Sequence, residues 1–117
     1  MNVRAKGSAG EREFCSWLKK NFSIDTERNL DQVREGGSDI IWDRFAFEIK
    51  RVENPDLESF WLQAKGECDG KTPIVAFRRN RHKWSFLIGP ENIGCKHGFL
   101  QLKEETFKEW FKNEITR

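Results

Sequence analysis

The chain has 117 residues and a mass of 13.8 kDa, a length suited to one domain, and we expect residues 1–117 to form it. Hydrophobic residues make up 37% and charged residues 34%, which excludes a disordered chain. No apolar run approaches the ~20 residues that span a bilayer, and Met1 to Gly10 lack the apolar segment of a secretion signal, so we expect a cytoplasmic protein. The net charge of +2 is small, but residues 71–90 hold five bases and no acid, which predicts one face for an anion.

The cysteines are few and widely spaced. Cys15, Cys68 and Cys95 form no close pair, so a disulfide framework is not expected. Cys95 and His97 are neighbours and His82 lies upstream, but zinc prefers four more tightly paired ligands. We therefore expect reduced, structural thiols.

The first predicted element is an amphipathic helix over residues 9–22. Ser8 can cap it with Glu11 three residues later. Glu11 also lies on the side that faces the core, where an acid without a partner is costly. It therefore either bonds back to the cap or belongs to a site. The apolar face is formed by Phe14, Trp17, Leu18 and Phe22. A short strand is expected near residues 24–28, followed by a polar loop over residues 29–37.

Two strands are predicted next, over residues 39–42 and 45–50. If Asp43 and Arg44 form a two-residue turn, Asp39 faces Glu48 across the hairpin, and Lys50 projects on the same side as Glu48. The apolar residues of both strands then share the opposite side. Asp-Arg lacks the Gly or Asn that such turns favour, and a loop of odd length would separate the two acids.

This arrangement would have a chemical consequence. Two carboxylates so close repel each other unless a proton or a cation lies between them, and hard oxygen ligands suit Mg²⁺ or Mn²⁺. Lys50 could orient a water molecule or stabilise charge that develops on phosphorus. The alternative is a solvated strand face with no catalytic role, and the residues alone leave both interpretations open.

The remaining elements complete a mixed sheet. Asn54-Pro55 is expected to open a second helix that ends around residues 66–70, with Leu57, Phe60, Trp61, Ala64 and Cys68 as its apolar stripe. Strands are predicted over residues 73–77 and 84–88, on either side of a basic tip. A last helix runs from about Lys103, with its apolar side formed by Phe107, Trp110, Phe111 and Ile115. The pattern predicts an α/β protein of α+β type, with a central mixed sheet flanked by helices.

Three motifs resemble the PD-(D/E)XK nuclease superfamily, and within it the archaeal-type Holliday-junction resolvases and their phage relatives. They are Lys6-Gly7-Ser8-Ala9-Gly10-Glu11-Arg12, Ser38-Asp39-Ile40-Ile41 and Glu48-Ile49-Lys50. The resemblance covers residues 4–89 in motif order and spacing, although Ser38 stands where the superfamily has Pro. It implies the restriction-endonuclease-like fold and a metal-dependent DNA endonuclease. Such enzymes are usually homodimers that nick four-way junctions, here in a bacterial, archaeal or phage-infected cell.

The resemblance also assigns roles to residues. Glu11, Asp39, Glu48 and Lys50 correspond to catalytic residues, and the two central acids would bind Mg²⁺, for which Mn²⁺ can substitute, together with Glu11 and the backbone carbonyl of Ile49. Gln63 corresponds more weakly to a glutamine that some members place near the site. A surface helix glutamine is the simpler interpretation.

Basic side chains are spread along the chain and suit contacts to DNA phosphates rather than to bases, since no recognition-helix pattern is present. The candidates are Arg4, Lys6, Arg12, Arg28, Arg34, Arg51, Arg78, Arg79, Arg81 and Lys83. We expect the tryptophans to fill the core. Two other functions stay open: a nuclease for linear duplex or flaps, and a non-catalytic DNA-binding module that keeps the fold.

Overall fold

The computed structural model describes residues 3–28, 37–90 and 98–116, with side chains of the first helix from Ala9 onward. Arg34, Cys95 and His97 lie outside the described residues, as do the side chains of Arg4 and Lys6. None of the helices in these ranges is long and apolar enough to cross a bilayer.

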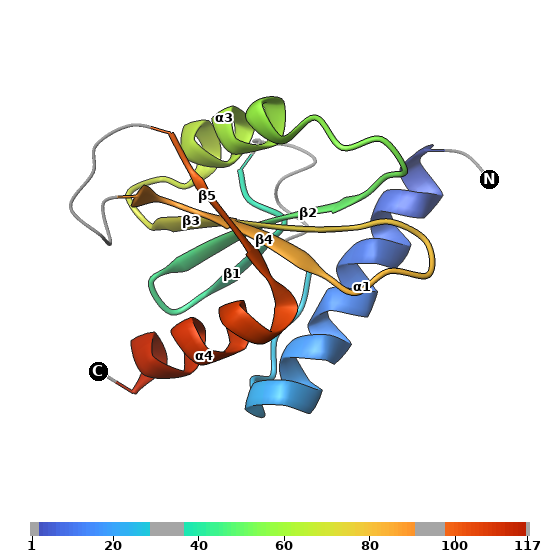
Figure 1. Cartoon of the computed structure of the whole chain (residues 1–117). Helices are drawn as coiled ribbons and strands as arrows, with labels where there is room; N and C mark the ends of the chain where they lie inside the picture. Colours follow the sequence, from blue (N-terminus) through green and yellow to red (C-terminus); the bar gives the residue numbers. More distant parts are fainter. Residues whose placement is uncertain (1–2, 29–36, 91–97, 117) are drawn as a thin grey trace.

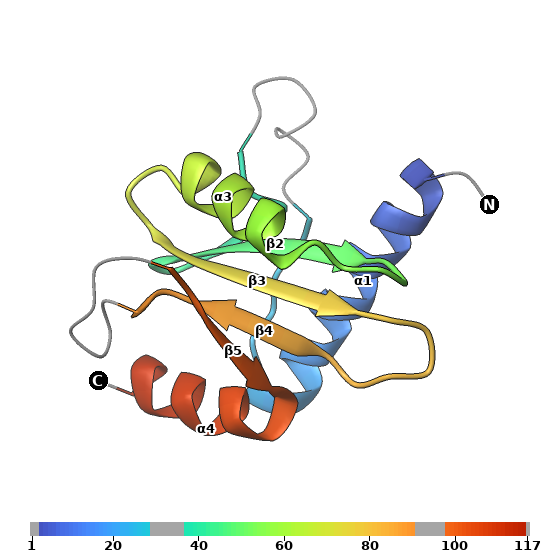
Figure 2. The same ribbon diagram turned by 45° about the horizontal axis from the view of Figure 1, so that its top comes forward.

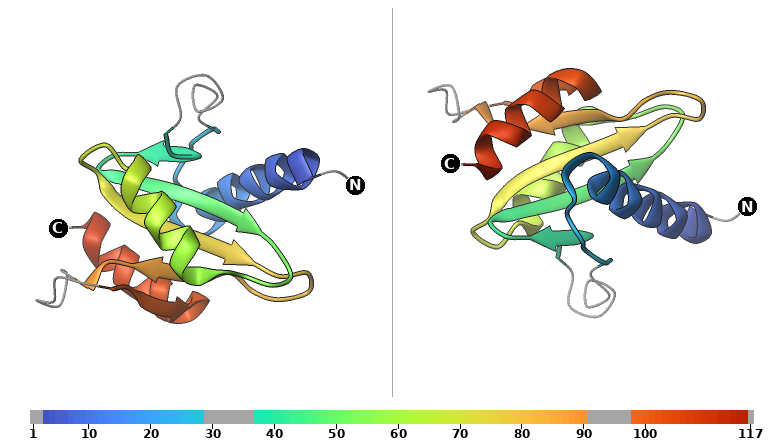
Figure 3. Two further views of the ribbon diagram at one scale, coloured as in Figure 1. Left: turned by 90° about the horizontal axis from the view of Figure 1, so that it is seen from above. Right: turned by 90° about the horizontal axis from the view of Figure 1, so that it is seen from below.

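A five-stranded mixed sheet forms the centre of the molecule, with strands in the order β1-β2-β3-β4-β5. Only β2 and β3 pair in parallel, and the other neighbours are antiparallel. Helices α1 and α4 cover one face and α3 covers the other (Figures 1, 2 and 3). The predicted mixed sheet flanked by helices is therefore confirmed. The elements are α1 (Val3–Phe22), β1 (Ile40–Trp42), β2 (Phe45–Arg51), α3 (Leu57–Glu67), β3 (Thr72–Arg78), β4 (Ser85–Ile88), β5 (Leu100–Lys103) and α4 (Glu104–Ile115).

Aromatic side chains fill the layer between the sheet and the pair α1 and α4. Phe86 and Phe107 stack with ring centroids 3.7 Å apart, and Phe14 contacts Trp17, Phe47 and Trp84. A smaller cluster lies under α3 and consists of Trp61, Ala64, Val75, Phe77 and Leu87. All five tryptophans are buried or partly buried against these two clusters, as the sequence predicted.

Three local predictions were wrong. Helix α1 begins at Val3, so Ser8 lies inside it and the proposed capping box with Glu11 does not exist. Residues 24–28 form no strand, because only Ile24 of that segment is buried and its polar neighbours have no apolar face to pack. Strand β5 was missed because its apolar–polar alternation extends over only four residues and its two leucines are only half-buried.

Helix α3 begins later than predicted. Asp56 rather than Asn54 is its N-cap, and the Asp56 carboxylate accepts a hydrogen bond from the Ser59 amide at 3.2 Å. Trp61 and Ala64 anchor the helix on the sheet, which leaves Gln63 exposed and brings the last residue, Glu67, close to the N-terminal end of β1.

Candidate active site

The β1–β2 hairpin has the predicted register. Ile40 faces Phe47 and Trp42 faces Phe45, so the turn does contain two residues. Asp43 takes the left-handed conformation with φ 54°, which Asp tolerates better than most residues other than glycine. Arg44 holds the turn against α4 by donating a hydrogen bond to the Glu114 carboxylate at 3.0 Å. Tertiary contacts thus compensate for a turn sequence that is unfavourable by itself.

Asp39 is fixed at the start of this hairpin by two backbone interactions. Its amide donates to the carbonyl of Phe47 at 3.0 Å, and its carboxylate Oδ2 accepts a hydrogen bond from the amide of Ile49 at 2.8 Å. The side chain is only 9% exposed. One carboxylate oxygen is therefore used to hold Asp39 next to Glu48, as the predicted pairing requires.

Among the described residues, Glu48 has an unusual environment for an acid. It is 1% exposed, and in the described part of the chain no N–H or O–H group donates a hydrogen bond to either carboxylate oxygen. Its neighbours are themselves acids, Asp39 and Glu67. Burial, the neighbouring acid group of Glu67 and the charge of Asp39 together raise the pKa of Glu48 to about 10.

The pKa of Asp39 is raised as well, to about 6. Burial is the largest cause, and the negative charge of Glu11 adds to it, while the hydrogen bond from Ile49 acts in the opposite direction. Without a cation the Asp39 and Glu48 pair therefore holds at least one proton at neutral pH. A site that keeps buried carboxylates at this cost has the electrostatic character of a cation site.

Glu67 is a third acid of the site, and the sequence analysis did not select it. It ends α3, and its backbone carbonyl accepts a hydrogen bond from the Ser38 hydroxyl at 3.1 Å. This bond ties the end of α3 to the residue before Asp39. One signal was available: Glu67 follows Gln63 by four residues and so shares its helical face.

Lys50 lies on the open side of the carboxylates. Its ammonium donates a hydrogen bond to Gln63 Oε1 at 2.8 Å and lies 5.5 Å from the ring centre of Phe60. Lys50 is half-buried and Gln63 is exposed. The structure thus brings together the lysine and the glutamine that the sequence linked only weakly.

Glu11 enters the site from α1. It is 7% exposed and forms an ion pair with Arg28, and its charge acts on Asp39. Two residues further along α1, Glu13 forms ion pairs with both Arg51 and Arg78. Glu13 was missed because both partners lie far from it in the sequence, at the ends of the neighbouring strands β2 and β3. Three of the predicted DNA-binding arginines therefore have carboxylate partners in the protein itself.

Four of the other predicted phosphate contacts remain available to a ligand in the described part of the chain. Arg12, Arg79, Arg81 and Lys83 are exposed, and no carboxylate within the described ranges forms an ion pair with any of them. Arg12 lies on α1 and the other three lie on the loop between β3 and β4.

The donor set fits a hard divalent cation. Asp39 and Glu48 offer carboxylate oxygens, and both oxygens of Glu48 are buried without a hydrogen-bond donor. The backbone carbonyl of Ile49, the residue between Glu48 and Lys50, is a third candidate ligand. In the described ranges no group of three or more His, Cys, Asp or Glu side chains is placed so that it could hold a metal ion, so the acids available as ligands are the pair Asp39 and Glu48. Two carboxylates with a carbonyl would leave several positions for water, which is the usual state of Mg²⁺ in proteins.

Comparisons with known proteins give a match at the level of structure. No protein-family model matches the chain, and no curated protein matches it in sequence. Among solved structures, the chain is similar to Hjc, a Holliday junction resolvase from the archaeal hyperthermophile Archaeoglobus fulgidus. The match has a TM-score of 0.52 and 21% sequence identity, and it covers 81% of this chain and 85% of the other. This likeness shows that the chain has the restriction-endonuclease-like fold.

Proposed function

We propose that this protein is a metal-dependent DNA endonuclease that hydrolyses phosphodiester bonds at four-way junctions. The observation that carries the proposal is the Asp39 and Glu48 pair, buried beside Lys50 with two carboxylate oxygens that no donor in the described residues satisfies. The fold shared with a junction resolvase supports it. We further propose that two copies act together, because a junction presents two equivalent strands for cutting.

In this proposal Mg²⁺, or Mn²⁺ in its place, is held by Asp39, Glu48 and the backbone carbonyl of Ile49. When bound, it would supply positive charge near the scissile phosphate and increase the acidity of a coordinated water. Glu11 would add negative charge from α1, and its ion pair with Arg28 holds that loop residue beside the site. Glu67 would keep Glu48 in place from the other side.

Lys50 is the residue proposed to act on the substrate. Its ammonium, oriented by Gln63, would face a phosphate oxygen and stabilise the charge that builds up on phosphorus. In hydrolysis the water oxygen bonds to phosphorus, one P–O ester bond breaks, the water loses a proton to solvent, and the departing oxygen gains one. The basic residues Arg12, Arg79, Arg81 and Lys83 would hold the DNA backbone during this step.

Cleavage assays with Asp39→Asn test the proposal. Labelled four-way junction, flap and linear duplex are incubated with the wild-type protein in Mg²⁺, in Mn²⁺ and in chelator. Asp43→Asn is the matched control, because it makes the same substitution at an exposed turn position of the same hairpin. We expect Asp39→Asn to bind the junction in a gel-shift assay but to lose cleavage by about a hundredfold or more, and Asp43→Asn to cut normally.

The same experiment separates the alternatives. Preferential cutting of the junction supports a resolvase, whereas preferential cutting of flap or duplex would replace that substrate with a repair or restriction-like one. Undiminished cleavage by Asp39→Asn would refute the assigned site. Binding of DNA with no metal-dependent cutting of any substrate would show a non-catalytic module.

A further inference from the structure

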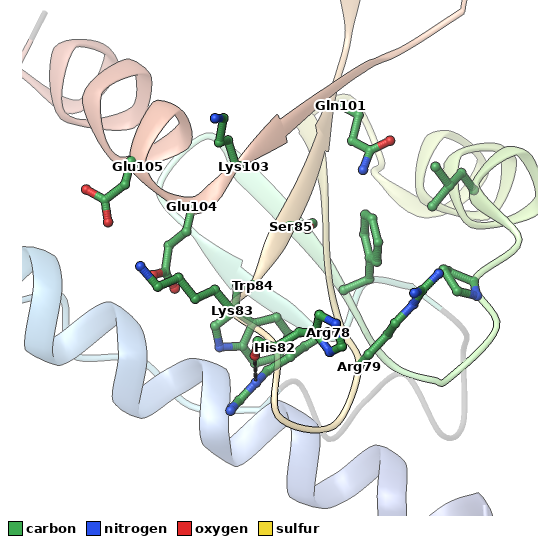
Figure 4. A pocket seen from close by; sticks show the side chains of 13 residues that line it. Arg78, Arg79, His82, Lys83, Trp84, Ser85, Gln101, Lys103, Glu104 and Glu105 are labelled. Atoms are coloured by element: carbon green, nitrogen blue, oxygen red, sulfur yellow. Dashed lines mark hydrogen bonds between the residues drawn. The ribbon is translucent and has the colours of Figure 1, made fainter.

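A pocket of about 630 Å³ lies beyond the proposed active site, between the start of α3, the β3–β4 loop and the edge strand β5 (Figure 4). Part of its lining is apolar and includes Pro55, Leu57 and Phe77; we call these three side chains the apolar floor. Arg79, Lys83 and Lys103 stand around it and carry positive charge. The volume lies within the range of pockets that hold small organic ligands.

The charge of this pocket is available to a ligand. Arg79, Lys83 and Lys103 are exposed, and in the described part of the chain none of them has an ion-pair partner. Two acids also border the pocket, at the start of α4. Trp17 donates its indole N–H to the Glu104 carboxylate at 2.9 Å, which positions that side chain but leaves its charge in place. Glu104 and Glu105 therefore both oppose an anion, and the three cations exceed them by one charge.

The rim of the pocket is held in position by several hydrogen bonds. Arg78 Nε donates to the carbonyl of His82 at 2.6 Å, and the amide of His82 donates to the carbonyl of Arg79 at 3.2 Å. The amide of Asn80 donates to Glu53 Oε1 at 3.0 Å. A loop fixed in this way presents its cations without a large ordering cost on binding.

A short row of side chains connects the pocket with the active site. Lys50 and Phe77 are neighbours in the parallel pairing of β2 with β3. Phe60 lies between them on the same face: its ring centre is 5.5 Å from the Lys50 ammonium and 6.4 Å from the ring centre of Phe77. The pocket and the Lys50 ammonium therefore lie on the same face of the sheet.

We propose that the pocket binds one unpaired nucleotide of a DNA strand that passes through the active site, with its phosphate among Arg79, Lys83 and Lys103 and its base against the apolar floor. In a paired duplex the bases are stacked inside and only phosphates and sugars face a protein surface that binds the backbone, so no base can contact the apolar floor. Unpaired bases, in contrast, gain affinity from contact with aromatic and apolar side chains. The inference rests on the proposed function in taking DNA as the ligand, but it does not require cleavage.

DNA binding in chelator tests the inference, because no strand is cut there. Fluorescence anisotropy compares a short blunt duplex, the same duplex with a few unpaired thymidines, and the same tail built of abasic sugars. We expect the thymidine tail to bind about 5- to 50-fold more tightly than the blunt duplex, and the abasic tail to lose most of that gain. Lys103→Gln is expected to reduce the affinity advantage of the thymidine tail severalfold. The slope of log affinity against log salt for tailed DNA should also fall by about one unit, the loss of one phosphate contact.

Lys112→Gln on α4 is the matched control, since it removes the same charge from an exposed site outside the pocket. Arg79→Gln provides a second pocket variant, and urea unfolding of each variant identifies any that fail to fold. The backbone amides of Ser85 and Gln101 should shift in NMR spectra with the thymidine tail and stay unchanged with blunt duplex. Equal affinity for blunt and tailed DNA, or equal losses for Lys103→Gln and Lys112→Gln, would overturn the inference and leave the nuclease proposal intact. Loss of cleavage in Asp39→Asn does not affect this assay, so the two proposals fail separately.

Discussion

Replacing Glu48 by Gln is expected to stabilise the metal-free protein, although it removes a residue proposed to be essential. Glutamine has nearly the same shape and carries no charge, and its amide has two hydrogens to donate to the neighbouring carboxylates of Asp39 and Glu67, whereas a protonated Glu48 has one. The variant side chain stays neutral without taking up a proton, whereas burial forces Glu48 to do so.

The magnitude follows from the raised pKa of Glu48. An acid whose pKa is 4.5 when unfolded and about 10 when folded keeps more protons in the folded state, so folding stability falls as pH rises between those values. Each pH unit in that window costs at most about 1.4 kcal/mol, which gives a ceiling of about 3 kcal/mol between pH 5 and pH 7. The Glu48→Gln protein lacks this contribution, so its advantage in stability should grow as pH rises.

Urea unfolding across this pH range, in chelator and in Mg²⁺, measures the effect. In chelator Glu48→Gln should be more stable than the wild type at neutral pH, and the difference should shrink toward pH 5. Saturating Mg²⁺ should stabilise the wild type by about 2–3 kcal/mol at a hundredfold excess over its dissociation constant and the variant much less. Glu109→Gln, at an exposed position of α4, is the control and should show neither effect. A wild type that is more stable than Glu48→Gln in chelator at every pH would refute the reasoning.

Three further predictions concern the elements around the site. Lys50→Met should slow single-turnover cleavage by about a hundredfold or more while metal-induced stabilisation is kept, and loss of both would contradict its assignment to the substrate. Gly10→Ala should destabilise the protein by about 1–3 kcal/mol in urea unfolding, because a Cβ there would lie 2.6 Å from Arg51 Cγ. Gly66→Ala is the control: a Cβ there would have no atom within 4 Å, so the substitution should be neutral or stabilising by up to about 1 kcal/mol. Glu13→Gln should cost about 1–2 kcal/mol in the same assay, because it weakens two half-buried ion pairs, and an unchanged stability would show that they contribute nothing.

The hairpin was predictable because its information is local. Alternation of apolar and polar residues fixes which side chains share a face, and a loop of two residues fixes which residues pair, so the positions of Asp39, Glu48 and Lys50 followed from the sequence. The turn was the uncertain step, and it depends on contacts of Arg44 with α4 that no local pattern contains.

The remaining features depend on how distant elements pack. Glu67 reaches Glu48 only because α3 lies at a particular angle across the sheet, and Glu13 meets its two arginines only because α1 crosses the ends of β2 and β3. Gly10 belongs to the same crossing, since the lack of a side chain lets the helix approach Arg51. Sequence patterns describe the faces of single elements, and these contacts arise between elements.

The most direct test of the proposed site is anomalous scattering from crystals of the protein soaked in Mn²⁺. The proposal predicts a peak roughly 2 Å from carboxylate oxygens of both Asp39 and Glu48 and from the backbone carbonyl of Ile49, and no such peak in Asp39→Asn crystals. A bound ion at another place in a protein that cleaves DNA, with no ion between Asp39 and Glu48, would contradict it.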